Sequence, residues 1–324
     1  MTFLNKNEDV RHHRHNHHRP HRRKNRIWKF LLGFLAIFLV FDAFAAYKLY
    51  HDAKQAADTT YQSVKHKSQR NGNTVIKNKK PFSLLILGTD TGEYGRTYRG
   101  RSDTIMVAVV NPDKKTTTLV SIPRDTKVAI QGHGFDNKIN AAYSYGGVSL
   151  AMNTIQSYLG IPIDHYVEMN MKGLVQLSSA VGPVKVNNDL DFTNLGYHFK
   201  KGEVTINKDN ILAFTRMRYQ DPRGDYGRQL RQRQVITALV KKGMKFNNLL
   251  KYRSILNAVS SNTKTDLTFA QMKILATDYR QAGNVKQYQL QGVGKQIGGV
   301  DYEVVPQANL NKITNVLKTA LEIK

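Results

Sequence analysis

The stretch from Arg216 to Gln234, RMRYQDPRGDYGRQLRQRQ, concentrates side chains that can bind a phosphate. Arg216 and Arg218 are two residues apart, so in an extended segment both leave the same face. Three further side chains fall at i, i+3 and i+4 of a predicted helix that Asp225 can cap: Arg228, Arg231 and Gln232. Several guanidinium groups near a helix N-terminus suit a multiply charged phosphate. A solvated basic face remains the alternative for this stretch taken alone.

Three carboxylates fall at the ends of predicted strands. Asp90 follows the first strand, Asp103 precedes the second, and Arg124 and Asp125 follow the third. If the second and third strands form a hairpin and the first lies parallel to the third, these residues gather on one rim with Arg101, where α/β proteins commonly bind ligands. Carboxylate oxygens without His or Cys favour Mg²⁺ over zinc. The alternative is that Asp90 and Asp103 cap turns and that Arg124 and Asp125 pair with each other.

The elements that position these residues alternate along the chain. Apolar runs and alternation predict strands at 83–88, 104–110, 116–122, 165–169, 184–187, 285–290 and 302–305. Helices are predicted near 138–145, 148–159, 171–181, 208–215, 227–243, 246–259, 268–282 and 308–322. This order predicts an α/β fold with a mixed central sheet covered by helices on both faces.

The N-terminal region differs in composition from the rest. Residues 1–29 form a basic, His-rich tail, for which disorder is the default and metal binding an alternative. Residues 30–50 contain the run FLLGFLAIFLVFDAFAAY, which is long enough for a transmembrane signal anchor; a cleaved signal peptide is the rival interpretation. The positive-inside rule places the tail in the cytoplasm and the following chain outside the cell. Residues 51–80 are predicted to be a stalk, and residues 81–324 a folded domain.

The composition and net charge limit the classes of function that the chain can have. The chain has 324 residues, a formal net charge of +25 and no cysteine. The charge suggests a polyanionic partner: nucleic acid, an anionic membrane or a phosphate-rich polymer. Without cysteine, disulfides, thiolate zinc sites and cysteine nucleophiles are excluded, and no P-loop, HExxH or GxSxG pattern is present.

Five blocks together resemble one family. In chain order they are LLILGTD, RSDTIMVAVVNP, SIPRDT, DNKINAAYSYGG and RMRYQDPRGDYGRQLRQRQ. Preceded by a signal anchor, this series is similar to the LytR-CpsA-Psr family over residues 82–244. The resemblance implies an enzyme that transfers a glycopolymer, such as a teichoic acid or a capsular polysaccharide, from a polyprenyl-pyrophosphate carrier to the N-acetylmuramic acid of peptidoglycan.

The resemblance also implies roles for individual residues. Asp90 and Asp103 match metal-associated carboxylates, for Mg²⁺ or Mn²⁺. The positions that match pyrophosphate-binding residues are Arg101, Arg124, Arg216, Arg218, Arg228 and Gln232. The residues expected to act in catalysis are Asp103, Arg124, Asp225 and Arg228. Among these, Asp225 matches an acidic position associated with activation of the acceptor.

Two other functions compete with the transferase. One is a membrane-bound transcriptional regulator, which the basic charge permits. The arginine-rich block, however, is predicted to lie outside the cell, and the tail has no helix-turn-helix pattern, so no nucleic-acid partner is expected. The other is a non-catalytic protein that binds an anionic wall polymer, which has no use for three carboxylates on one rim. An apolar channel for a polyprenyl chain is expected beside residues 148–159 or 171–181, although both segments also suit ordinary core helices.

Overall fold

The computed structural model describes residues 24–90, 100–244 and 252–324, the side chains of residues 24–38, 244, 252 and 253 excepted. The first helix, α1 (Lys24–Thr60), is 37 residues long. In the described part of the chain, no helix is both long and apolar enough to cross a membrane. The expected anchor at residues 30–50 begins where the side chains of α1 are not described, and most of the basic tail lies outside the described residues.

The chain divides into two compact units between His51 and Asp52. The second unit, Asp52–Lys324, is built on a mixed sheet of six strands in the order β11 (Thr263–Thr265), β6 (His165–Asn170), β1 (Phe82–Thr89), β2 (Ser102–Asn111), β3 (Thr116–Ser121) and β12 (Asn284–Gln289). The strand β1 pairs in parallel with β6 and antiparallel with β2, and β2 pairs antiparallel with β3. The sequence-predicted hairpin of the second and third strands is therefore confirmed.

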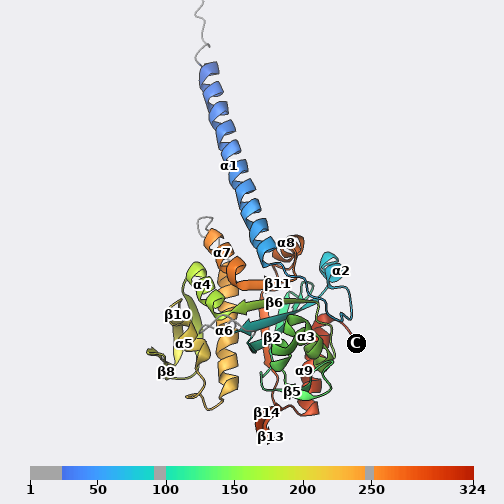
Figure 1. Ribbon diagram of the computed structural model, residues 1–324. Helices are drawn as coiled ribbons and strands as arrows, with labels where there is room; N and C mark the ends of the chain where they lie inside the picture. The colour runs from blue at the N-terminus through green and yellow to red at the C-terminus, as the bar shows by residue number, and fades with distance from the viewer. Residues whose placement is uncertain (1–23, 91–99, 245–251) are drawn as a thin grey trace, which may run out of the picture. The chain divides into compact units, whose positions relative to one another are not determined.

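Helices cover both faces of this sheet (Figure 1). On one face, α3 (Ala141–Leu159) and α9 (Gln307–Leu321) pack against side chains such as Leu85 and Val107. On the other face, Ile236 of α6 (Asp225–Met244) packs against Met106 and Ala108. Because β1 and β2 are buried on both sides, their sequences are almost continuously apolar, as in strands covered by helices. The predicted α/β architecture is confirmed.

A second core lies beside the sheet, where α4 (Met171–Val181) and α5 (Ile211–Arg216) pack with α6. Two short antiparallel pairs complete it: β7 (Val184–Asn188) with β10 (Gly202–Ile206), and β8 (Phe192–Asn194) with β9 (Tyr197–Phe199). Figure 1 shows this group on one side of the sheet, around the labels α4, α5, β8 and β10. The helix α4 has the predicted bounds because Asn170 caps it, accepting a hydrogen bond from the Gly173 amide at 2.8 Å.

The helix α3 combines two sequence-predicted helices. Gly147 has φ 65° and ψ −154°, a conformation that is essentially restricted to glycine, and it separates the two segments. The first segment starts at Ala141 and not at residue 138, because residues Asp136–Lys138 form the strand β5, which pairs with β4 (Lys127–Ala129).

The remaining elements were predicted only in part. They are α2 (Gly72–Lys77), α7 (Tyr252–Asn262), α8 (Phe269–Asp278), and the hairpin of β13 (Val293–Ile297) with β14 (Val300–Val304). Glu303 of β14 donates its amide to the Asp125 carbonyl at 2.9 Å, which fixes this hairpin beside the end of β3.

Residues 61–80, expected to be a stalk, pack against the sheet domain. Arg70 donates from Nε to Asp164 Oδ1 at 2.7 Å, and the Asp164 carboxylate also accepts from the Ser83 amide. Ile76 is fully buried. The compact unit begins at Asp52, earlier than the boundary at residue 81 expected from composition. The polar composition of the segment gave no sign of this packing, because the segment is held by the Arg70–Asp164 ion pair and a few apolar side chains, of which Ile76 is fully buried.

Candidate functional site

The end of the sheet gathers the predicted carboxylates. Since β1 and β3 both run antiparallel to β2, the end of β1, the start of β2 and the end of β3 meet at one end of the sheet. Asp90, Asp103 and Arg124 belong to these three ends and line one cavity of about 540 Å³, which we call the polar cavity. The strand order therefore brings these residues together as the sequence predicted.

The polar cavity carries charges of both signs. Its lining comprises Asp90, Gly100, Arg101, Asp103, Arg124, Asp125, Lys138, Asn140, Ser144, Arg218 and Asp301. Arg124 Nη1 donates to Asp103 Oδ1 at 2.8 Å, and Lys138 Nζ lies 2.9 Å from Asp125 Oδ1. Burial alone lowers the pKa of Arg124, but the neighbouring carboxylates, Asp103 first, outweigh it and raise the pKa. Arg124 is thus held as a cation at the cavity wall.

The first turns of α6 carry a second group of predicted residues. Arg228 is 8% exposed; its Nη2 lies 2.6 Å from Asp225 Oδ1 and 3.4 Å from the Asp103 carbonyl oxygen. Gln229 Nε2 donates to Asp225 Oδ2 at 2.8 Å. Asp225 is not among the residues that line the polar cavity. The geometry shows Asp225 orienting Arg228, and its expected role in activating the acceptor stays a prediction.

Arg228 is buried with hydrogen-bonding capacity that no described residue uses. Burial is the main cause that lowers its pKa, and Asp225 opposes this effect. Arg228 Nε and the neighbouring Gln232 Oε1 are buried without a hydrogen-bond partner among the described residues. Because an unpaired buried polar group costs free energy, a ligand that supplies partners here regains that cost on binding.

A second cavity of about 280 Å³ lies between the sheet, α4 and α6, and we call it the apolar cavity. It is lined by Leu84, Ile86, Leu87, Gly88, Thr104, Val167, Met169, Asn170, Met171, Leu174, Leu177, Thr215, Arg216, Gln232, Val235, Ile236, Leu239 and Val240. Residues 171–181 thus form one wall, as expected. Residues 148–159, the other expected wall, do not line this cavity, and their buried side chains pack in the core on the opposite face of the sheet.

Arg216 and Arg218 face different cavities. The sequence suggested an extended segment with both side chains on one face, but Arg216 is the last residue of α5 and the chain leaves the helix at Met217, with φ −58° and ψ 132°. Arg216 lines the apolar cavity and Arg218 the polar one. The two arginines therefore mark the boundary between an apolar and a charged compartment.

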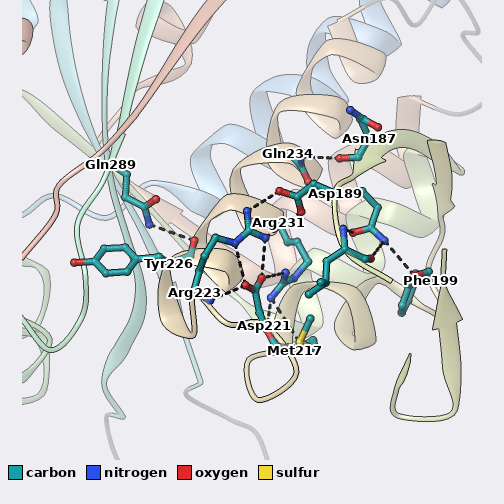
Figure 2. Close-up of polar contacts among 12 residues, drawn as sticks. Asn187, Asp189, Phe199, Met217, Asp221, Arg223, Tyr226, Arg231, Gln234 and Gln289 are labelled. Atoms are coloured by element: carbon teal, nitrogen blue, oxygen red, sulfur yellow. Dashed lines mark hydrogen bonds and ion pairs between the residues drawn. The ribbon is translucent and has the colours of Figure 1, made fainter. Parts of the chain in front are cut away.

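Two other arginines of the basic stretch stabilise the loop before α6. Arg231, 1% exposed, donates from Nη1 to Asp221 Oδ2 and from Nη2 to the Met217 carbonyl, both at 2.6 Å. Arg223 hydrogen-bonds both Asp221 and Asp189. Figure 2 shows the guanidinium groups of Arg223 and Arg231 pointing toward the Asp221 carboxylate. This network was not predicted from the sequence, although an aspartate inside a run of arginines was the available signal.

Opposing effects act on the pKa of Asp221. Burial raises it, but the hydrogen bonds from Arg223 and Arg231 outweigh burial and hold the pKa below the ordinary aspartate value. Asp221 therefore stays ionised, and the loop that carries Arg218 is anchored on both sides.

Several lining residues of the polar cavity had no predicted role: Lys138, Asn140, Ser144 and Asp301. The first three lie on the DNKINAAYSYGG block. Asp301 comes from β14, which is far away in the sequence and reaches the cavity through the backbone pairing of Glu303 with Asp125. No local pattern in the sequence signals that placement.

The carboxylates at the sheet end fit a hard divalent cation. In residues 24–90, 100–244 and 252–324, no group of three or more acidic or histidine side chains is arranged to hold a metal. Mg²⁺, however, is commonly bound by one or two carboxylates together with substrate phosphates. Asp90 and Asp103 line the same cavity, and Gly100 makes room for the first, because a Cβ at Gly100 would come within 2.0 Å of Asp90 Oδ1.

The fold and its two cavities define an α/β protein suited to a ligand with one apolar and one anionic part. The profile of the LytR_cpsA_psr family matches residues 44–319. The chain therefore belongs to this family.

Its relatives include named enzymes and solved structures. Polyisoprenyl-teichoic acid–peptidoglycan teichoic acid transferase TagU of Enterococcus faecalis is 50% identical over 278 residues, which cover 86% of this chain and 91% of the relative. The crystal structure of Bacillus subtilis TagU has 39% identity and a TM-score of 0.62, and the match covers 76% of this chain and 99% of that one. The structure of TagT bound to LI-WTA has 28% identity and a TM-score of 0.66, covering 81% and 97% of the two chains.

Proposed function

We propose that this protein transfers a teichoic acid or a similar glycopolymer from a polyisoprenyl-pyrophosphate carrier to peptidoglycan. The names of its relatives support this activity, and so does the relative that binds LI-WTA. The chain covers 91% of the E. faecalis transferase, so the proposal concerns the whole of that activity and not one part of it.

The position of the apolar cavity beside the polar cavity carries the proposal. Arg216 and Gln232 belong to the apolar cavity, whereas Arg218 and Arg124 belong to the polar one. A polyprenyl chain in the apolar cavity would place its pyrophosphate at the arginines between the apolar and the polar cavity. Guanidinium groups bind phosphate oxygens in pairs, which fixes the orientation of the anion as well as neutralising it.

The reaction that fits this arrangement is displacement at phosphorus. An acceptor hydroxyl attacks the phosphorus that carries the glycopolymer, its proton passes to a carboxylate, and the polyprenyl phosphate leaves. Such a reaction depends on charge neutralisation more than on covalent catalysis. Arg124, Arg218 and Arg228 supply positive charge to the phosphate oxygens, and Asp225 keeps Arg228 in position.

A divalent cation is part of the proposal. Asp90 and Asp103 would hold Mg²⁺ or Mn²⁺, which would neutralise negative charge on the phosphate oxygens. We expect Asp103→Asn to weaken metal binding measured by calorimetry, and excess EDTA to abolish transfer. Full activity in EDTA would exclude a catalytic metal.

Lipid binding in the apolar cavity can be tested by a substitution that fills the cavity. Leu177 lines the apolar cavity, whereas Ser179 lies on the exposed face of the same helix. We expect Leu177→Trp to reduce transfer from a long-chain polyprenyl donor by at least about tenfold, roughly 1.4 kcal/mol, and to spare a donor with a short prenyl chain. Ser179→Trp is the matched control. If both donors are used equally well by Leu177→Trp, the lipid does not bind in this cavity.

The proposed substrates also imply a location. A polyprenyl carrier resides in the membrane, and peptidoglycan lies outside it. We therefore propose a single-pass membrane protein with its N-terminus in the cytoplasm and its catalytic domain outside, with no nucleic-acid partner.

A further inference from the structure

An exposed aromatic cluster lies next to the polar cavity. It consists of His133 and Phe135, from the loop between β4 and β5, and Tyr145 of α3. The ring centroids are 5.4 Å apart for His133 and Tyr145 and 6.0 Å apart for Phe135 and Tyr145. Phe135 and Tyr145 are each 47% exposed. Three rings that contact one another yet remain open to solvent form a surface suited to a ligand with an apolar face.

Hydrogen bonds hold the cluster in place. Asn137 Nδ2 donates to the Tyr145 hydroxyl at 2.8 Å. The Ile130 amide donates to the Phe135 carbonyl at 3.1 Å, which closes the loop that presents Phe135. A surface that is already ordered loses little conformational entropy when a ligand binds.

The cluster is adjacent in the sequence to residues of the cavity wall. Tyr145 directly follows Ser144, and Asn137 directly precedes Lys138; both Ser144 and Lys138 line the polar cavity. Asn140 lines it as well, is 2% exposed, and has no hydrogen-bond partner for Oδ1 among the described residues. Its side chain makes no capping bond to α3. An unpartnered amide oxygen on a residue that lines a cavity can accept a hydrogen bond from a ligand hydroxyl or amide.

We propose that the aromatic cluster and Asn140 together form the binding site for the acceptor glycan, the N-acetylhexosamine chain of peptidoglycan. The proposal rests on the proposed transferase function and assigns its second substrate to a surface. Pyranose rings have one face of C–H groups that stacks on aromatic rings and an edge of hydroxyl and amide groups that forms hydrogen bonds. The cluster supplies the first kind of contact, and Asn140 and Ser144 supply the second.

Local charge gives a polyanionic donor polymer little attraction to this surface. Asp136 lies beside the cluster and Asp125 and Asp301 line this side of the polar cavity, while the nearby lysines are paired: Lys127 with Asp136 and Lys138 with Asp125. Because these carboxylates and lysines neutralise each other, this surface attracts a polyanionic donor polymer less than the arginine side of the cavity does. The positive charge for its phosphates is at the arginine side of the cavity, which Arg124 and Arg218 line.

Direct binding tests the proposal independently of transfer. The probes are peptide-free N-acetylglucosamine–N-acetylmuramic acid oligosaccharides and, in parallel, lipid-free teichoic acid polymer, titrated calorimetrically into the full-length protein. We expect Tyr145→Ala and Phe135→Leu each to weaken oligosaccharide binding by roughly five- to tenfold. Tyr145→Phe keeps the ring but loses the hydrogen bond from Asn137, so its loss of affinity should be smaller than that of Tyr145→Ala. Affinity for the teichoic acid polymer should not change in any variant.

Tyr197→Ala is the matched control for the ring variants. Tyr197, an exposed tyrosine of β9, lines neither cavity, so Tyr197→Ala should leave oligosaccharide binding unchanged. The proposal is overturned if the wild type does not bind the oligosaccharide, if the ring variants bind it as tightly as the wild type, or if they lose teichoic acid affinity instead. Failure of the wild type to transfer polymer while this binding pattern holds would reject the transferase function and leave a glycan-binding site.

Discussion

Burial decides what each guanidinium can bind within residues 216–234. Arg231 is fully buried, and both of its Nη groups donate to Asp221 and the Met217 carbonyl, so it is structural. Arg228 is buried beside Asp225 and still has an unpaired Nε. Arg218 is half-buried and faces the polar cavity. Arginines of one short segment therefore divide into loop anchors and groups available to an anion.

The role of Arg218 in binding the anion can be tested by substitution. Arg218→Lys keeps the charge but loses the two-pronged geometry that matches a phosphate. Because a hydrogen bond to a charged group is worth about 1.5–3 kcal/mol, we expect transfer to fall by at least about tenfold. The melting temperature should hardly change, since Arg218 is not part of the Asp221 network.

The control for Arg218 is Arg280, an exposed arginine that lines neither cavity. Arg280→Lys should leave both the transfer rate and the melting temperature unchanged. Equal effects of the two substitutions on initial rates would show that Arg218 contributes only surface charge.

The hydrogen bonds that Asp221 accepts from Arg223 and Arg231 should make the stability of the fold depend on pH. Asp221→Asn leaves the buried Arg231 without a carboxylate, so we expect the free energy of unfolding at neutral pH to fall by about 3–5 kcal/mol. The pKa of Asp221 in the folded protein is below the unfolded value of about 3.9. The advantage of the wild type is therefore complete above about pH 4 and is lost as the pH falls toward the folded pKa.

Thermal unfolding of both proteins between neutral pH and about pH 2.5 measures this dependence. The gap between their melting temperatures should narrow below about pH 4. A gap of constant size over the whole range would mean that the Asp221 charge does not stabilise the fold.

Elements with a strong apolar pattern were predictable, and elements held by polar contacts were not. The strands β1 and β2 were found because they are nearly continuous apolar runs, and the helix α4 because its apolar side chains repeat with the period of a helix. The pairs β4–β5 and β8–β9 are three residues per strand, too short for a period to emerge. The packing of residues 61–80 depends on Arg70 and Asp164, partners that lie 94 positions apart.

The kink in α3 depends on the backbone conformation of one residue, Gly147. Gly147 adopts φ 65° and ψ −154°, so Gly147→Ala forces a side chain into a conformation that glycine alone adopts readily. We expect a loss of about 1–3 kcal/mol in the free energy of unfolding, measured with denaturant. Gly283→Ala is the control: it has no positive φ and open space around a built Cβ, so it should change stability by less than about 0.5 kcal/mol. Equal losses for the two variants would remove the strain argument.

At the scale of the whole molecule, the candidate site was only half visible in the sequence. Asp90, Asp103 and Arg124 were predictable because hairpin pairing brings strand ends together. Of the apolar cavity only the wall at residues 171–181 was predicted, because the other walls come from strands and helices between residues 84 and 240 and no single segment has an unusual pattern. Asp301 enters the site through the backbone of a distant hairpin. Chain folding, and not local chemistry, sets these contacts.

The predicted membrane topology concerns the whole chain. Residues 1–29 carry far more basic than acidic groups, and the apolar run inside residues 30–50 follows them directly. The cost of moving many cations across a bilayer keeps such a tail in the cytoplasm, so the chain after residue 50 should lie outside the cell. Protease added to intact protoplasts should therefore digest the domain and leave an epitope tag at the N-terminus protected. Lysed protoplasts, in which both ends are cleaved, provide the control. A domain that stays intact until lysis would contradict the anchor and would place the arginine-lined cavity on the wrong side of the membrane for peptidoglycan.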